Sequence, residues 1–269
     1  MNILVQHQPA FVYTGKTNFD ADKLTVLFIH GAANDHQVWL GLMGALDGFG
    51  MNTLAVDLPG HGKTFESVKT SITTYADWII DLLDNAGINH AVLVGHSMGS
   101  LIALDCAIRY PTRVAKMILI GTAAPMPVAE KILLMAHEQP ETAIDMLVRA
   151  SFYVQKCADG TWPPATAAMQ SYRDLLSASR PGVLANDMNV CNQFSIGPPA
   201  LKQIKMPTLV MVGAEDKMTS PQAGTAVALS ITHAEIVVIP AAGHMMMVES
   251  PIAVRTAVAR MILETAVDR

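Results

Sequence analysis

The chain contains few charged residues, few cysteines and no basic cluster. Charged side chains make up only 15% of its 269 residues, and the formal net charge is −5. Without clustered Lys and Arg, neither nucleic acid nor an anionic membrane is expected as a partner. The three cysteines, Cys106, Cys157 and Cys191, are odd in number and widely separated, unlike a disulfide framework. We therefore expect a protein of the reducing cytoplasm.

Other kinds of segment are also missing. No apolar run reaches the roughly 18 residues that a transmembrane helix needs, so no stable membrane association is expected. The opening MNILVQHQPAFVYTGK has no basic stretch followed by a long apolar one, and no signal peptide is predicted. Histidine and cysteine never cluster at the spacing of zinc ligands, so the sequence does not indicate a metal.

Apolar residues, by contrast, make up 51% of the chain, enough for a large core. Short β-branched runs predict strands at 24–29, 52–57, 91–95, 116–121, 208–213 and 235–240. Nearly continuous apolar strands are typical of a parallel sheet that is covered on both faces. Helical patterns between the strands, for example at 73–87, then predict an α/β fold with a doubly wound, mostly parallel sheet. The first 16 residues are expected to add an antiparallel edge.

This alternation is interrupted once, from about Pro125 to Ala200. The segment shows no strand pattern, only helical pieces separated by prolines and glycines. We predict a helical cap over residues 125–200, with an α/β core domain formed by residues 1–124 and 201–269. A monomer or a homodimer is expected.

A serine lies at the junction of a predicted strand and a predicted helix. Residues 95–99, Gly-His-Ser-Met-Gly, match the pattern G-x-S-x-G. A tight turn at this place lifts the serine side chain above the sheet, and flanking glycines let strand and helix approach closely. Ser97 is then a candidate nucleophile. The alternative is that Ser97 only caps the N-terminus of the helix that follows.

A nucleophilic serine needs a base, and the base needs a carboxylate to orient it. In open α/β sheets, functional residues gather at the carboxyl ends of the strands. His244 follows the last predicted strand directly, whereas His90 and His233 precede strands. The side chain of His96 is expected to point away from the hydroxyl of Ser97. His244 is therefore the predicted base.

The acid and the oxyanion hole are predicted from two other loops. Glu215 and Asp216 follow the strand at 208–213, and as neighbours they point in different directions, which leaves both open at this point. An oxyanion hole requires two backbone amides. One should come from Met98, after the nucleophile, and the other from Ala32 in the loop after the strand at 24–29.

Five segments, in order, resemble those of an α/β-hydrolase of the serine esterase/lipase type. They are FIHGAA, DLPGHGKT, VGHSMGS, VGAEDKMTSP and AAGHMMMVESP, and the resemblance covers essentially the whole chain. It implies a triad of Ser97, Asp216 and His244, because in the family the third residue after the strand-ending glycine is the acid. It also implies cofactor-free acyl transfer in two steps. Asp57 and His61 in DLPGHGKT would then shape a turn and take no part in catalysis.

Within this family, residue types favour a serine carboxylesterase acting on short- to medium-chain carboxylic esters. Hydrolases of carbon–carbon bonds often have Asn before the nucleophile and Trp after the catalytic histidine, where this chain has His96 and Met245. A carbon–carbon bond hydrolase or lactonase of the same fold is one alternative. A small-ligand receptor without catalysis is another.

The residues that bind the substrate are not predicted by any motif. Six methionines are expected near the mouth of the site: Met98, Met126, Met218, Met245, Met246 and Met247. Their adaptable side chains suit an acyl pocket of undemanding shape. Trp162, Tyr153, Arg149 and Arg173 are further candidates from the predicted cap, and with Arg180 the arginines are the obvious cations there for a substrate carboxylate.

Overall fold

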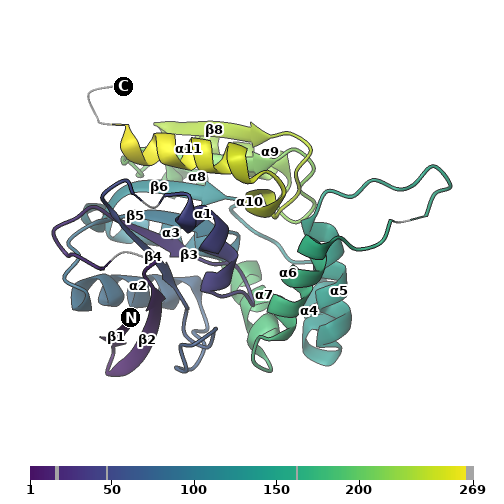
Figure 1. Cartoon of the computed structure of the whole chain (residues 1–269), viewed down its shortest axis with the longest axis horizontal. Coiled ribbons are helices and arrows are strands. Elements are labelled where there is room, and N and C mark those ends of the chain that lie inside the picture. The colour runs from purple at the N-terminus through teal and green to yellow at the C-terminus, as the bar shows by residue number, and fades with distance from the viewer. Residues whose placement is uncertain (16–17, 47, 162, 265–269) are drawn as a thin grey trace.

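An eight-stranded, mostly parallel β-sheet forms the centre of the molecule. The computed structural model describes residues 1–15, 18–46, 48–161 and 163–264. In chain order the strands are β1 (Asn2–Val5), β2 (Gln8–Tyr13), β3 (Thr25–Ile29), β4 (Asn52–Val56), β5 (Ala91–His96), β6 (Val114–Ile120), β7 (Thr208–Gly213) and β8 (Ala234–Ile239). Across the sheet their order is β1-β2-β4-β3-β5-β6-β7-β8 (Figure 1). Strands β3 to β8 are parallel, whereas β1 and β2 pair antiparallel at one edge.

This arrangement confirms the predicted α/β fold and its doubly wound sheet. Each of the six predicted strands is present, with ends that differ from the prediction by no more than two residues. Strands β3, β4, β5 and β7 are buried at every position. They read as continuous apolar runs because helices cover both faces of the sheet.

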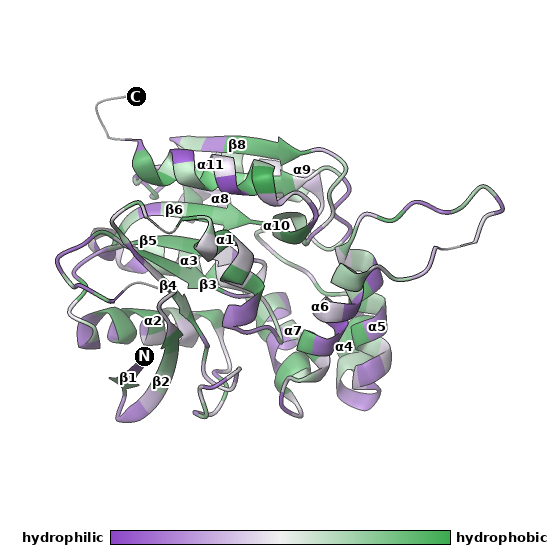
Figure 2. Cartoon of the chain, viewed as in Figure 1, coloured by the Kyte–Doolittle hydropathy of each residue, from purple (hydrophilic) through white to green (hydrophobic). Residues whose placement is uncertain are grey.

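Helices lie on both sides of the sheet. Helices α1 (Leu40–Gly44) and α11 (Pro251–Leu263) lie on the near side in Figure 1 and contact each other. Helices α2 (Ile72–Asn85), α3 (Met98–Arg109) and α9 (Pro221–Ser230) complete the covering. Figure 2 shows mainly hydrophobic residues in the central strands, while α11 carries hydrophobic and hydrophilic residues in turn. Helix α11 therefore buries one stripe, whereas Met98 to Ala107 of the central helix α3 are all buried.

Helix α2 shows how the sequence produces such a stripe. Ser71 accepts a hydrogen bond from the amide of Thr74, which caps the helix at its first turn. Ile72, Tyr75 and Ile79 then follow at intervals of three or four residues, and all three are buried. This spacing places them on one face of the helix, which packs against α3 and the sheet.

The segment between β6 and β7, here called the insertion, is helical. Its helices are α4 (Glu130–Glu138), α5 (Pro140–Ser151), α6 (Ala167–Ser177), α7 (Val183–Gln193) and α8 (Pro198–Leu201), and its described residues form no strand. Figure 1 shows α4 to α7 gathered at the end of the sheet toward which β6 and β8 point, with the α5–α6 connection projecting outward. The insertion thus lies over the carboxyl ends of the strands.

The structure bears on two expectations from the sequence, the absence of a transmembrane helix and the absence of disulfides. Within the described residues, no helix is both long and apolar enough to cross a bilayer. Cys106, Cys157 and Cys191 all lie in the described part and form no disulfide. The cytoplasmic location and the monomeric or homodimeric state stay predictions.

Strand β5, helix α3 and strand β3 approach one another through backbone atoms at two glycines. A Cβ on Gly95 would lie 2.3 Å from the carbonyl oxygen of Gly99, and a Cβ on Gly99 would lie 2.1 Å from that of Ile29. Backbone atoms of a central strand cannot move aside as a flexible side chain can. Glycine is therefore required at both positions.

We expect Gly99→Ala to destabilise the fold by at least about 2 kcal/mol, because the added methyl overlaps β3. Gly41→Ala is the matched control, since Gly41 lies in α1 with open space around its Cα. Alanine there should leave stability unchanged or raise it slightly. Urea denaturation of both variants measures the difference in unfolding free energy. Equal stability of the two variants would contradict the close approach.

Candidate active site

Ser97 lies at the turn between β5 and α3 in a backbone conformation that non-glycine residues rarely adopt. Its φ is 53° and its ψ is −119°. The turn is locked because the amide of Ser97 donates to Ile120 at 3.0 Å and its carbonyl accepts from the amide of Ser100 at 2.8 Å. Such strain persists where surrounding structure enforces it, commonly at active sites.

The side chain of Ser97 does not have the role of a helix cap. It forms no capping hydrogen bond to the first turn of α3. Ser97 is half-buried between buried neighbours, so its hydroxyl is held at the surface of a cavity. The structure therefore favours the interpretation as a nucleophile over the interpretation as a simple N-cap.

The structure brings His244 and Asp216 into direct contact. Nδ1 of His244 lies 2.8 Å from Oδ2 of Asp216, and both side chains are buried. With the Nδ1 hydrogen donated to the carboxylate, Nε2 of His244 carries the lone pair. His244 and Ser97 line the same small cavity, of about 20 Å³. This is the arrangement expected of an oriented base beside a serine.

Backbone contacts explain why these two loops meet. A Cβ on Gly213, at the end of β7, would lie 2.2 Å from the carbonyl oxygen of Gly243. The amide of Glu215 donates to Ala242 at 2.9 Å, which extends the pairing of β7 and β8 into their loops. Glu215 is exposed, so Asp216 is the carboxylate that turns inward to His244.

Asp216 is held as a carboxylate by several donors. Its Oδ1 accepts from the amides of Met218 and Thr219 at 2.8 and 2.9 Å. Its Oδ2 also accepts from the hydroxyl of Thr219 at 2.8 Å. Burial opposes ionisation, but His244 and these hydrogen bonds together hold the pKa of the Asp216 carboxyl below its usual value. Thr219, which sequence reasoning missed, is thus part of the site.

The ring of His96 packs against His244: the ring centroids of the two residues are 4.6 Å apart, and Nε2 of His96 lies 3.1 Å from the carbonyl oxygen of His244. The expectation that His96 points away from the hydroxyl of Ser97 stays a prediction. Burial, together with the neighbouring His244, lowers the pKa of His96 to about 3. His96 is therefore a neutral packing partner of His244 and a poor base.

A larger cavity, of about 310 Å³, also opens at Ser97. Its wall combines core residues such as Ala32 and Met218 with Leu147 of α5 and Met188 of α7. Lys217 is the only charged side chain among its described lining residues. An apolar chamber therefore adjoins the serine, with the insertion as its outer wall.

The two amides predicted for the oxyanion hole lie beside this chamber. Ala32 lines both cavities that touch Ser97. Met98 is the first residue of α3, so its amide has no acceptor within the helix. An oxyanion hole formed by the amides of Ala32 and Met98 stays a prediction.

Only part of the methionine prediction matches the structure. Met126 and Met218 line the larger Ser97 cavity, together with Met146 and Met188 from the insertion, which were not predicted. Met98, Met245, Met246 and Met247 are instead almost fully buried, and none lines that cavity. The sequence could not separate these groups, because methionine serves both as core and as pocket lining.

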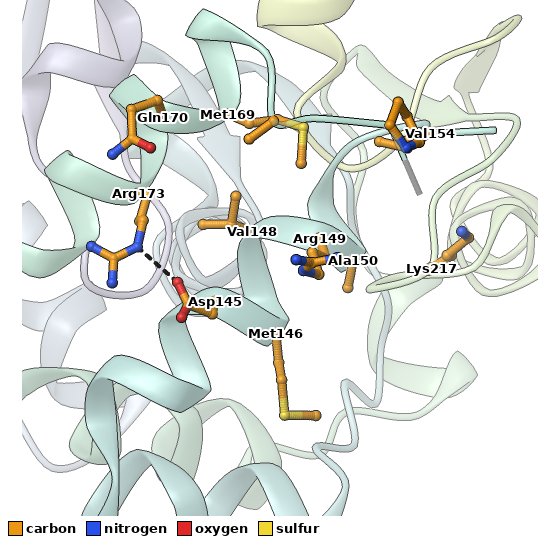
Figure 3. A pocket seen from close by; sticks show the side chains of 12 residues that line it. Asp145, Met146, Val148, Arg149, Ala150, Val154, Met169, Gln170, Arg173 and Lys217 are labelled. Atoms are coloured by element: carbon orange, nitrogen blue, oxygen red, sulfur yellow. Dashed lines mark hydrogen bonds and ion pairs between the residues drawn. The ribbon is translucent and has the colours of Figure 1, made fainter. Parts of the chain in front are cut away.

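A further cavity, of about 520 Å³, lies within the insertion (Figure 3). It is bordered by α5, α6 and Lys217, and it shares Met146, Ala150 and Lys217 with the larger Ser97 cavity. The shared residues form a common wall. A ligand longer than the Ser97 chamber would reach this outer cavity next.

The arginines of the insertion have different surroundings. Arg173 donates to Asp145 at 2.7 Å, the contact drawn in Figure 3, and to Glu141 at 3.0 Å, so its charge is compensated. Arg180 donates to the backbone carbonyls of Gly62 and Thr64 at 2.7 and 2.9 Å, away from both cavities. Arg149 lines the outer cavity, and no described residue pairs with it.

The remaining candidates from the insertion contribute less. The amide of Tyr153 donates to Glu249 at 2.6 Å, and its side chain lines neither the Ser97 cavities nor the outer cavity. Trp162 lies outside the described residues. Neither residue is placed at the serine by the structure.

Asp57 and His61 are buried, as expected of residues that shape a turn. Asp57 accepts from the amide of His36 at 2.7 Å and from that of Lys63 at 2.8 Å. Nε2 of His61 lies 2.7 Å from Asp187, which α7 of the insertion contributes. Burial disfavours charge on His61, but the Asp187 carboxylate raises the pKa of the imidazole above its usual value. No sequence motif predicted Asp187.

One group of potential metal ligands occurs in the part of the chain that the structure describes. Ligand atoms of Asp35, His36 and Asp57 all lie within 4.8 Å of one another. Nδ1 of His36 is, however, 2.8 Å from Oδ1 of Asp57, a direct hydrogen bond. These atoms satisfy one another, and the group is separate from Ser97.

Comparison with known proteins finds relatives over most of the chain. A relative from Paraburkholderia phymatum, a 2-hydroxy-6-oxononadienedioate/2-hydroxy-6-oxononatrienedioate hydrolase, is 28% identical over 239 residues, which are 83% of this chain and 82% of the relative. A solved thermophilic esterase is 27% identical, with a TM-score of 0.79, over 97% of this chain and 96% of that chain. The enol-lactonase from Burkholderia xenovorans LB400 shares the fold at 22% identity, with a TM-score of 0.83 over 98% and 100% of the chains.

A family model matches most of the chain. Residues 26–257 match the model of the alpha/beta hydrolase family, from the second residue of β3 into α11. The matched segment includes the strained serine turn and the buried His–Asp pair described above. The chain belongs to the alpha/beta hydrolase family.

Proposed function

We propose that this protein is a serine hydrolase that cleaves short- to medium-chain carboxylic esters through an acyl-enzyme. The observation that carries the proposal is the position of Ser97. It lies in a strained turn beside the His244–Asp216 pair, and it opens into an apolar cavity of about 310 Å³. A neutral ester fits such a wall better than a charged substrate does.

In the first step the Ser97 hydroxyl attacks the ester carbonyl while its proton passes to Nε2 of His244. Asp216, hydrogen-bonded to Nδ1, holds the imidazole in this orientation and stabilises its charged form. The oxyanion that forms accepts hydrogen bonds from the amides of Ala32 and Met98. His244 then gives its proton to the departing alkoxide, which leaves Ser97 acylated.

In the second step water attacks the acyl group. His244 takes a proton from the water, and the same two amides stabilise the second oxyanion. Collapse of this intermediate releases the carboxylic acid and returns the proton to Ser97. Every protein group in the cycle belongs to this chain.

The nucleophile is tested first. We expect Ser97→Ala to lower p-nitrophenyl butyrate hydrolysis on the order of 10⁴-fold or more and to leave thermal stability nearly unchanged. A fluorophosphonate should modify the wild-type protein at Ser97 alone, as read by mass spectrometry of peptides. An active Ser97→Ala variant, or labelling elsewhere, would rule out the mechanism. Absence of a nitrophenol burst in the wild type would favour a receptor.

The choice of acid is tested by a matched pair of adjacent residues. Asp216→Asn should lower kcat by several orders of magnitude, about 10⁴-fold in the best-studied triad, because the amide favours the wrong imidazole tautomer. Glu215→Gln removes the same charge from an exposed side chain and should change kcat less than about twofold. Steady-state kinetics on one ester compares them. Equal losses would overturn the assignment of Asp216.

A carbon–carbon bond hydrolase is the second candidate. The relative from Paraburkholderia phymatum, 28% identical over 83% of this chain, favours it, since that protein is a hydrolase of a dienedioate. A substrate of this kind carries carboxylates, which need cations. Arg173 and Arg180 are engaged with other groups, whereas Arg149 lines the outer cavity without an ion-pair partner among the described residues. This candidate would therefore use the outer cavity for a carboxylate.

One comparison of substrates separates the candidates. We expect kcat/KM for p-nitrophenyl acetate and butyrate to exceed that for a ring-fission dienoate by at least about tenfold, given the apolar wall at Ser97. Arg149→Gln should leave ester hydrolysis within about twofold. Arg255→Gln is the control, because Arg255 is an exposed arginine on α11, which does not belong to the insertion. Rapid dienoate cleavage that is lost in Arg149→Gln but kept in Arg255→Gln would establish the second candidate.

A further inference from the structure

A buried ion pair joins the insertion to the core. Asp187 of α7 and His61 of the loop after β4 are both almost fully buried, and Oδ2 of Asp187 lies 2.7 Å from Nε2 of His61. Nδ1 of His61 lies 2.9 Å from the carbonyl oxygen of Pro59 and donates to it, so the hydrogen on Nε2 belongs to the charged imidazolium. The contact is therefore between a full anion and a cation.

The same oxygen of Asp187 also holds the loop that carries Ala32. Oδ2 accepts a hydrogen bond from the backbone amide of Ala33 at 2.8 Å. Ala33 has a φ of 54°, in the left-handed region that side chains with a Cβ disfavour. Its amide would lose its acceptor if Asp187 were absent. The carboxylate thus compensates for an unfavourable backbone conformation.

The rest of this loop is fixed by hydrogen bonds within the loop and by one that reaches α6, a second helix of the insertion. The amide of Asn34 donates to Gly31 at 3.2 Å, which closes the turn around Ala32 and Ala33. The side chain of Asn34 donates to the carbonyl of Ala32 at 2.9 Å and reaches the hydroxyl of Tyr172, on α6, at 3.4 Å. The direction of the Ala32 amide therefore depends on contacts with the insertion.

We infer that Asp187 is a positioning residue, which sets the oxyanion hole through Ala33. The inference rests on the proposed function, in which the amide of Ala32 binds the oxyanion. The same Asp187 oxygen then both attaches α7 to the core through His61 and orients the Ala32 amide through Ala33. A carboxylate of the insertion contributes to catalysis without touching the substrate.

A merely structural ion pair would behave differently from a positioning residue. Both roles lower stability when the pair is broken, because a buried charge loses its partner. If Asp187 positions the loop, removing its acceptor oxygen weakens binding of the oxyanion, whereas removing only the positive charge of His61 does not. Substituting the two residues one at a time therefore distinguishes the two roles.

The experiment compares Asp187→Ala with His61→Gln. Asp187→Ala removes the acceptor of the Ala33 amide, so we expect kcat to fall about 30-fold with KM within about twofold, as for a weakened oxyanion donor. His61→Gln also breaks the ion pair, but its side-chain amide can still donate to Asp187, and the Ala33 bond is kept. Its kcat should stay within about threefold even though its melting temperature falls.

Two readouts report on the oxyanion hole itself. A phenylboronic acid forms a tetrahedral anionic adduct with an active serine. Its affinity for Asp187→Ala should fall by about the same factor as kcat, whereas its affinity for His61→Gln should be close to that of the wild type. Asp105→Ala provides a second control, since Asp105 is a buried carboxylate paired with Arg109 at 2.9 Å. It should lower stability and leave boronate affinity unchanged.

The outcomes are decisive in both directions. Equal loss of kcat in Asp187→Ala and His61→Gln, or no loss in either, would overturn the inference and leave an ion pair that only stabilises. If Asp187→Ala does not fold, Asp187→Asn replaces it. Its amide oxygen is the weaker acceptor, so kcat should fall about threefold to tenfold while His61→Gln stays unchanged, and an unaltered kcat counts against the inference.

Failure of the proposed function is recognised separately. The rate at which a fluorophosphonate modifies Ser97 depends on the oxyanion hole and requires no particular substrate. If the wild type is not modified at Ser97, the proposed function fails. If the wild type and Asp187→Ala are modified at the same rate, the function stands and the positioning role is excluded.

Discussion

The close backbone contact of β5, α3 and β3 is the constraint on which the active-site geometry depends. Gly95, Gly99 and Ile29 meet at distances that leave no room for a Cβ on either glycine. Because helix α3 is pressed onto the sheet at its first turn, the chain must reverse within the residues between the two glycines. Ser97 is consequently forced to a positive φ. The same contact brings the first turn of α3, whose amides have no acceptor within the helix, directly after Ser97, so one packing contact accounts for both the strained turn and the position of these amides.

A second backbone contact completes the site from the other half of the sheet. Gly213 lies against Gly243, and pairing between the loops after β7 and β8 continues beyond the strands. Two loops separated by about a whole strand–helix unit are therefore held in register, which turns Asp216 toward His244 and leaves Glu215 in solvent. His96 packs against the His244 ring, and burial together with the neighbouring His244 lowers its pKa. His244 is thus held by the His96 contact, which includes the 3.1 Å approach of Nε2 to the His244 carbonyl oxygen, and by the carboxylate of Asp216.

The insertion contributes one wall of the cavity at Ser97. Its helices α5 and α7 supply the apolar wall of the Ser97 cavity, and its arginines are mostly engaged with acids or backbone carbonyls. Because α7 also carries Asp187, the element that forms the wall is tied to the loop that holds Ala32. Proteins with different printed activities, a dienedioate hydrolase and an esterase, resemble this chain over most of its length, so the fold alone does not identify the substrate.

The sheet was predictable from the sequence, since short continuous apolar runs between turn residues are typical of buried parallel strands. Ser97 and His244 were indicated because each follows a strand at the edge where carboxyl ends meet. The strand position left Glu215 and Asp216 both open, and the family resemblance alone implied Asp216. Three features became visible only in the folded chain: which methionines line the cavity, the packing of His96 against His244, and the pairing of Arg173 with acids. The tertiary structure alone brought Asp187 to His61 and Ala33, across more than a hundred residues of chain. Periodicity records whether a residue is buried, whereas the partner of a buried polar group depends on how separate elements pack, and no local pattern encodes that.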